Sequence, residues 1–160
     1  MNILPNLPED SRIWIYTSNR EFKDEEITQI QEMMNNFISS WNVHGKKLQA
    51  GFEVLYNQFI VLAVNEDVAS ASGCSIDSSV AIMKSLEKQF NVSLLDKLNL
   101  AYHSKNNKIA VLPMFKFQQE MDNKNITEQT IVFNNLIETL AELRTSWEVP
   151  LKDSWHKQLL

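Results

Sequence analysis

Cysteine is nearly absent, because Cys74 is the single cysteine in 160 residues. One cysteine excludes an internal disulfide and a zinc site made of several thiolates, and this usage is typical of a reducing compartment. The first residues lack the cationic and apolar regions of a signal peptide. No apolar run approaches the roughly 20 residues that a membrane helix needs. The sequence therefore predicts a cytoplasmic protein without membrane insertion.

Positive charge and glycine are also scarce. Lysine and arginine number 15 against 20 acidic residues, and no basic block occurs, so we expect no nucleic-acid partner. None of the three glycines (Gly45, Gly51 and Gly73) is followed by Lys-Ser or Lys-Thr. The phosphate-binding G-x-x-x-x-G-K-[ST] loop is therefore missing, and ABC-type ATP hydrolysis is not expected. The three histidines are scattered without metal-ligand spacing, so we expect no metal and no cofactor.

What the chain does contain is one strongly apolar stretch, Phe59 to Val64. Its β-branched and aromatic residues predict a strand that is covered on both faces. A loop of serine, alanine and glycine follows, and Gly73 there is free to adopt a positive φ. An amphipathic helix comes next, with Asp77 or Ser75 as its expected N-cap and Asn91 as its left-handed C-cap. Its apolar stripe consists of Ile76, Val80, Met83, Leu86 and Phe90.

The order of patterns along the chain predicts an α+β fold. Strands are expected at 12–17, 47–55, 59–64, 98–102 and 109–112, with helices from 24 to about 44 and from about 76 to 90. This β-α-β-β-α-β-β order suggests an open mixed or antiparallel sheet with helices on one face and ferredoxin-like connectivity. We expect an α+β core domain over 1–112. A C-terminal extension over 113–160 is expected to add a strand, a helix and a tail.

Four segments resemble a family of short bacterial proteins that are commonly catalogued as "ABC transporter ATPase". The resemblance spans essentially the whole chain, and no established activity comes with it. Its most specific parts are Gly73-Cys74-Ser75-Ile76-Asp77 and Lys152-Asp153-Ser154-Trp155-His156. The four segments are 14–20, 72–77, 130–135 and 147–156.

The loop at 70–79 is the candidate site, because a helix N-terminus presents free N–H groups and partial positive charge. The same dipole favours a thiolate, so Cys74 is the candidate nucleophile, with Asp77 to orient a base. His44, His103 and His156 are all possible partners of this thiol. The structural alternatives are that Cys74 is a small buried side chain and that the loop does no more than cap the helix. The candidate ligand-binding residues are Arg20, Ser72, Gly73, Ser75 and Ser78.

Two main functions and one further possibility fit these observations. The first is a non-catalytic domain that binds a small ligand or a protein partner with the 70–79 loop and Arg20. The second is a small cysteine-dependent enzyme with Cys74 as its nucleophile. The third is a homo-oligomeric building block, since the aromatic residues of the tail make a homodimer plausible.

Overall fold

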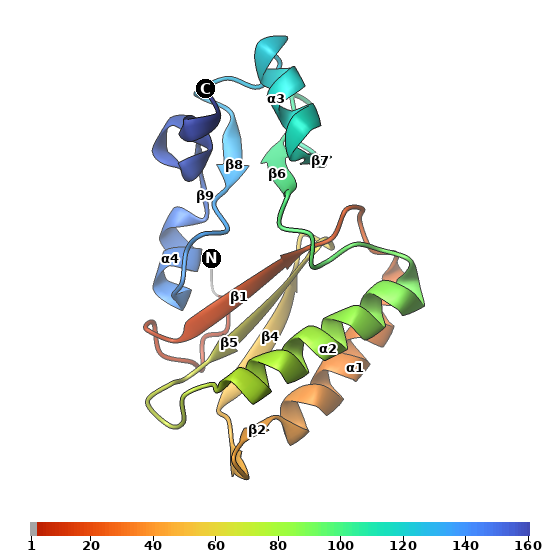
Figure 1. Ribbon diagram of the computed structural model, residues 1–160, viewed down its shortest axis with the longest axis vertical. Helices are drawn as coiled ribbons and strands as arrows, with labels where there is room; N and C mark the ends of the chain where they lie inside the picture. Colours follow the sequence, from red (N-terminus) through yellow and green to blue (C-terminus); the bar gives the residue numbers. More distant parts are fainter. Residues whose placement is uncertain (1–2) are drawn as a thin grey trace.

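The computed structural model describes residues 3–160 and contains two antiparallel sheets (Figure 1). The first sheet has the order β1-β5-β4, with β1 at Arg12–Thr17, β4 at Ala50–Leu55 and β5 at Phe59–Val64. The second sheet has the order β7-β6-β8-β9, with β6 at Asn99–His103, β7 at Ile109–Pro113, β8 at Ile131–Phe133 and β9 at Glu148–Pro150. A small hairpin joins β2 (Asn42–Val43) to β3 (Lys46–Lys47).

The helices are α1 (Asp24–Ser40), α2 (Gly73–Phe90), α3 (Met114–Asp122) and α4 (Leu140–Ser146). Two 3-10 turns, Leu151–Asp153 and Trp155–Leu159, end the chain. This content confirms the predicted α+β class with open antiparallel sheets. No helix within residues 3–160 has the length and apolar character required to cross a bilayer.

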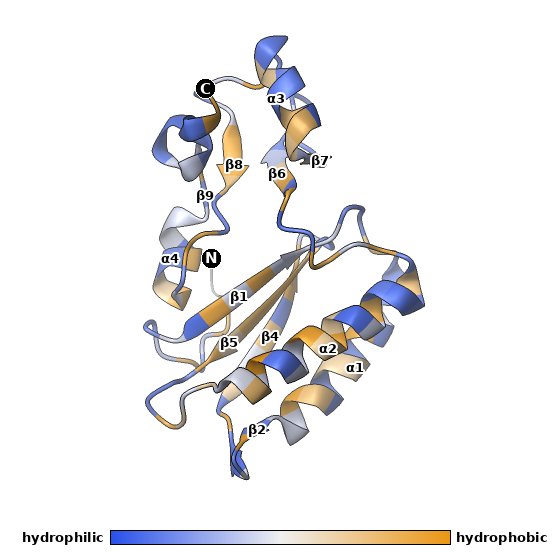
Figure 2. Cartoon of the chain, in the orientation of Figure 1, coloured by the Kyte–Doolittle hydropathy of each residue, from blue (hydrophilic) through white to orange (hydrophobic). Residues whose placement is uncertain are grey.

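The strand β5 is the centre of the structure, as its apolar run predicts. All six of its residues are buried. Ile60 and Leu62 pack on the side of α1 and α2, whereas Phe59, Val61 and Ala63 face the second sheet and α4. Figure 2 shows apolar colour along β1 and β5 between these two layers. The strand is therefore covered on both faces.

The single sheet expected from the sequence is instead divided in two. β6 does not extend the first sheet; it pairs with β7 and β8. The reason lies at the outer edge of β1, where other segments already occupy both ends: Ile13 N–H donates to Glu138 O at 3.0 Å, and Asn19 N–H donates to Ser93 O at 3.2 Å. The predicted boundary at residue 112 stays a prediction, although β6 and β7 share their sheet with strands of the C-terminal extension.

Candidate functional site

An enclosed hollow lies where the two sheets meet, and we call it the crease cavity. Its volume is about 370 Å³, which is within the usual range for small-molecule sites. It lies between the outer edge of β1, the start of α2, the loop before β6, the segment after β8 and the C-terminal tail. Segments far apart in the sequence therefore build it together.

The walls of the crease cavity are mostly apolar and come from both layers. Ile76 and Val80 of α2 form one side, with Leu94 of the following loop. Ala101 and Phe133 belong to the opposite side, under the second sheet. A ligand in this space would exchange water for apolar contact on two faces, which is the main source of affinity in such pockets.

His156 is the buried titratable group in the wall of the crease cavity. The residue is 1% exposed, and its Nδ1 lies 2.7 Å from Ser154 Oγ. Burial lowers the pKa of His156 to about 4, so the ring is neutral at pH 7. A neutral imidazole has one donor and one acceptor nitrogen, and either atom of the Ser154–His156 contact can donate. The wall thus contains a neutral ring that is able to form hydrogen bonds.

Asn135 places a second polar group in this wall. Its Nδ2 donates to Thr17 Oγ1 at 3.0 Å, and its Oδ1 accepts from Trp147 Nε1 at 2.8 Å. These bonds fix the segment after β8 against the end of β1. Sequence reasoning considered His156 only as a possible partner of the Cys74 thiol and did not select Asn135. The one signal for this wall was the aromatic residue Trp155 beside His156 in the tail.

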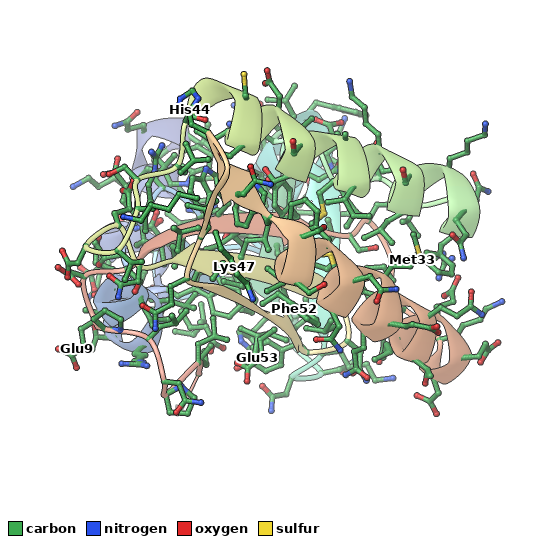
Figure 3. The ribbon with its side chains drawn as sticks, turned by 90° about the horizontal axis from the view of Figure 1, so that it is seen from below. Glu9, Met33, His44, Lys47, Phe52 and Glu53 are labelled. Atoms are coloured by element: carbon green, nitrogen blue, oxygen red, sulfur yellow. The ribbon has the colours of Figure 1, made fainter. Side chains whose placement is uncertain are left out.

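Cys74 lies in a different hollow, on the other side of α2, which we call the open hollow. The cysteine is exposed, and it lines a space of about 420 Å³ with Ser72, Ser75 and Ser78. His44 and Trp41 line the same space, and Figure 3 shows His44 beside the first turn of α2. Of the three histidines considered as partners of the thiol, the structure brings His44 to this hollow.

The serines of the open hollow are bound to their own helix. Ser72, and neither Asp77 nor Ser75, is the N-cap of α2: its Oγ accepts from Ser75 N–H at 3.3 Å, and its N–H donates to Ser75 Oγ at 2.7 Å. Ser78 Oγ donates to Cys74 O at 3.1 Å. The helix starts earlier than expected because the Ser72–Ser75 pair forms a reciprocal capping box.

Two other predicted residues are placed differently from the expectation. Asp77 is exposed and does not belong to the lining of the open hollow. Gly73 is the first residue of α2, and among residues 3–160 the glycine with a positive φ is Gly45. Gly73 therefore does not use the positive φ that glycine permits, because the residue already has helical geometry.

Arg20 does not join the candidate loop. Its guanidinium makes a bidentate pair with Glu26, with Nη1–Oε1 at 2.8 Å and Nη2–Oε2 at 2.9 Å. Its Nη2 also donates to Phe90 O at 2.7 Å, at the opposite end of α2 from Cys74. The Arg20 guanidinium lowers the pKa of Glu26 to about 2. Arg20 thus ties α1 to the end of α2, which corrects its assignment to the 70–79 site.

A cluster of His103, Glu148 and Tyr56 joins the two sheets. His103 Nε2 lies 2.7 Å from Glu148 Oε1, and Tyr56 O–H donates to Glu148 Oε2 at 2.6 Å. Burial and the carboxylate of Glu148 raise the pKa of Tyr56. The ring of His103 stacks on Phe133 with centroids 5.1 Å apart. The cluster therefore fixes the aromatic wall of the crease cavity from behind.

A third hollow, of about 610 Å³, lies between α1 and the edge strand β4. Figure 3 shows Phe52 and Glu53 on this side of the molecule. Burial raises the pKa of Glu53, and the carboxyl accepts a bond from the backbone of Leu4. Polar side chains of α1 and β4 line this hollow, namely Gln31, Asn35 and Glu53. The crease cavity is more enclosed and is built from more segments of the chain, so it is the better candidate.

Within residues 3–160, His, Cys, Asp and Glu side chains form no group of three or more that suits a metal ion. Comparisons of the chain with models of protein families, with curated proteins and with solved structures give no match. The candidate site is therefore argued from its own geometry.

Proposed function

We propose that this protein is a non-catalytic binding domain that holds a small, largely apolar ligand in the crease cavity. The observation that carries the proposal is the enclosed space of about 370 Å³ between the sheets, with apolar walls and few polar groups. Sites of this kind bind by apolar burial and use a few polar groups for orientation.

The polar groups of the crease cavity support binding rather than chemistry. His156 is neutral and faces the cavity beside apolar walls, and Asn135 is engaged with Thr17 and Trp147. A nucleophile and a base within hydrogen-bond reach of each other are the signature of covalent catalysis. The buried groups of this cavity supply a polar ring and an apolar surface, which suits recognition.

Adjacent residues of α2 provide a matched test. Val80 lines the crease cavity and Ala81 lines the open hollow. A fragment library of neutral aromatic and aliphatic amides is screened by ligand-observed NMR against the native protein, Val80→Phe and Ala81→Phe. We expect fragments that lose at least tenfold in affinity with Val80→Phe, which fills the cavity, and change little with Ala81→Phe.

Fragments that lose affinity with Ala81→Phe and bind Val80→Phe as they bind the native protein contradict the proposal. A screen without binders, or with binders that Val80→Phe leaves unaffected, shows that the crease cavity is not the site. Thermal unfolding of both variants checks that each has the native fold. Competition between fragments for one site confirms that they share the cavity.

A second candidate function is cysteine chemistry at the open hollow. The observation in its favour is that the exposed Cys74 and His44 line the same space. His44 has a φ of 50° in the turn between β2 and β3, a conformation that is uncommon for a non-glycine residue. If these residues act together, His44→Asn slows alkylation of Cys74 by iodoacetamide at least tenfold; an unchanged rate leaves only the binding function.

A further inference from the structure

The outer edge of β1 faces the crease cavity with unpaired backbone groups. Ile13 N–H donates outward to Glu138 O, and Asn19 N–H donates outward to Ser93 O. The direction of the backbone N–H and C=O groups alternates along a strand. The N–H and C=O groups of Ile15 and Thr17 therefore also point away from β5. Within residues 3–160 no hydrogen bond reaches the N–H or C=O of Ile15. Ile15 is half-buried, and backbone groups that leave water on folding normally find partners.

The open part of this edge has defined ends. The segment after β8 closes one end, where Leu140 N–H donates to Ser11 O at 3.0 Å. At the other end, Asn135 of the same segment donates to the Thr17 hydroxyl, and Ser93 O accepts from Asn19 N–H. Between these contacts the edge lines the crease cavity from Ile13 to Thr17, which is about 13 Å of extended chain at roughly 3.3 Å per residue. This length matches a strand of about three residues.

An added strand would find apolar walls on both of its faces. The side chains of β1 alternate, with Ile15 on the side of the second sheet and Tyr16 on the side of the helices. The cavity continues both layers beyond β1: Ile76, Val80 and Leu94 line the helix side, whereas Ala101, Phe133 and Ile137 line the side of the second sheet. Successive side chains of an added strand point to opposite faces, so every one of them would meet an apolar wall.

We propose that the ligand of the crease cavity is a short, extended, apolar peptide segment that pairs with Ile15 as an added strand of the first sheet. This inference rests on the proposed binding function and specifies its ligand. Main-chain bonds to a sheet edge supply affinity, and alternate side chains supply specificity. The volume of about 370 Å³ suits roughly three residues.

The charges at the cavity favour an uncharged segment over a free chain end. Asp96 and Lys97 are adjacent in the lining and have opposite signs, and His156 is neutral. Both charged residues are exposed, so the buried part of the cavity presents no charge to a terminal carboxylate or ammonium group. The neutral ring of His156 offers a hydrogen-bonding nitrogen to the far edge of the added strand. The segment is therefore internal to a longer chain or blocked at its ends.

The test uses the blocked peptide acetyl-Val-Ile-Val-amide and two N-methylated forms of it. One form is methylated at the isoleucine nitrogen, the other at both valine nitrogens. In an added strand, alternate N–H groups face β1, so one form loses at least tenfold in affinity by calorimetry and the other stays within threefold of the parent. Equal affinities of the three peptides, or an equal loss by both methylated forms, overturn strand pairing.

Amide exchange in the protein gives an independent readout. Bound peptide is expected to slow exchange of the Ile15 N–H at least tenfold, whereas the N–H groups of Trp14 and Tyr16, which face β5, serve as internal controls. Ile15→Pro removes this donor at an edge position that tolerates proline, and Ile15→Val keeps it. Peptide affinity should fall at least tenfold with Ile15→Pro and stay within threefold with Ile15→Val.

The two proposals fail in different ways. If neutral fragments bind the native protein and are lost in Val80→Phe, but no peptide binds, the inference is wrong and the binding function stands. If peptides bind with no alternation between the methylated forms, the cavity is a binding site without strand addition. If neither fragments nor peptides bind, both are wrong.

Discussion

Val80 and Ala81 are neighbours on α2, yet they line two hollows of opposite character. The open hollow gathers the reactive residue types, a thiol, hydroxyls and an imidazole, from the first turn of α2 and the segment after α1. The crease cavity gathers apolar residues and one buried histidine from five separate parts of the chain. The comparison teaches that reactive residues adjacent in sequence often serve their own helix, whereas a cavity arises from long-range packing.

Truncating one phenylalanine in the wall of each hollow gives the largest expected effect. Phe133 is 2% exposed and packs 4.8 Å from both Phe59 and Trp147 between ring centroids. Phe133→Ala is expected to lower the free energy of unfolding by about 3–5 kcal/mol. Phe37 is half-buried, so Phe37→Ala should cost only about 1–2 kcal/mol. Urea unfolding measures both values.

An equal decrease in the free energy of unfolding of the two variants would contradict this difference between the hollows. The wall of the open hollow would then belong to the core as much as the wall of the crease cavity does. Phe115→Ala is the surface control. Phe115 is 60% exposed, so its loss should change the free energy of unfolding by no more than about 0.5 kcal/mol.

The pH dependence of stability tests whether the crease cavity desolvates His156. In the folded protein the pKa of His156 is lowered from 6.5 to about 4. As pH falls from 6.5 towards 4, the unfolded chain binds a proton that the folded chain does not, so the free energy of unfolding decreases. The full loss is about 3 kcal/mol by pH 4, where protonation of the folded state ends it.

A variant isolates this contribution from that of the acidic residues. Glu26 has a pKa lowered from 4.5 to about 2, so its stabilisation is present above 4.5 and lost only below that pH. Above 4.5 the raised pKa of Glu53 contributes a slope of the opposite sign, so between 6.5 and 4.5 the histidine is measured as the difference between the native protein and a variant that lacks it. His156→Phe keeps the aromatic contact with Trp155 and Phe117. This variant should lose the part of the pH dependence of the thermal midpoint that comes from the histidine. An unchanged slope would show that the histidine is solvated.

Local features were predictable from the sequence, and pairings between distant segments were not. Hydrophobic periodicity predicted α2, and the six apolar residues from Phe59 to Val64 predicted a strand buried on both faces. These patterns depend on neighbours along the chain. The outer edge of β1 depends instead on Glu138 and Ser93, which bind its two ends from far away in sequence. Nothing in residues 12–17 signals that β6 pairs elsewhere.

The same limit explains the errors at individual residues. Arg20 looked free because its partner Glu26 lies in the first turn of α1, where an acidic residue has an ordinary role at a helix start. His156 looked like one of three scattered histidines because its burial comes from packing of the tail on β6 and α3. Conversely, Cys74 is exposed, so the expectation of a small buried cysteine is wrong.

Capping of α2 gives a smaller effect that separates structural from ligand-binding serines. Ser72 accepts the N–H of Ser75, so Ser72→Ala should lower the free energy of unfolding by about 1 kcal/mol. Asp77 is exposed and makes no cap, so Asp77→Ala should change it by less than about 0.5 kcal/mol. Urea unfolding of the two variants decides between the predicted caps. A larger cost for Asp77→Ala would return the N-cap to the position expected from the sequence.

The smallest expected effect is on the rate of thiol labelling, and it distinguishes the open hollow from the crease cavity most directly. Cys74 is exposed in the open hollow, so a maleimide should label it in the native protein without denaturant. Ala81→Phe places a ring in the same hollow and should slow labelling a few-fold, whereas Val80→Phe, on the cavity side, should leave the rate unchanged. Fragment affinity is expected to respond in the reverse order. If one substitution changes both readouts, the two hollows communicate through α2, and the helix no longer separates a binding cavity from a reactive surface.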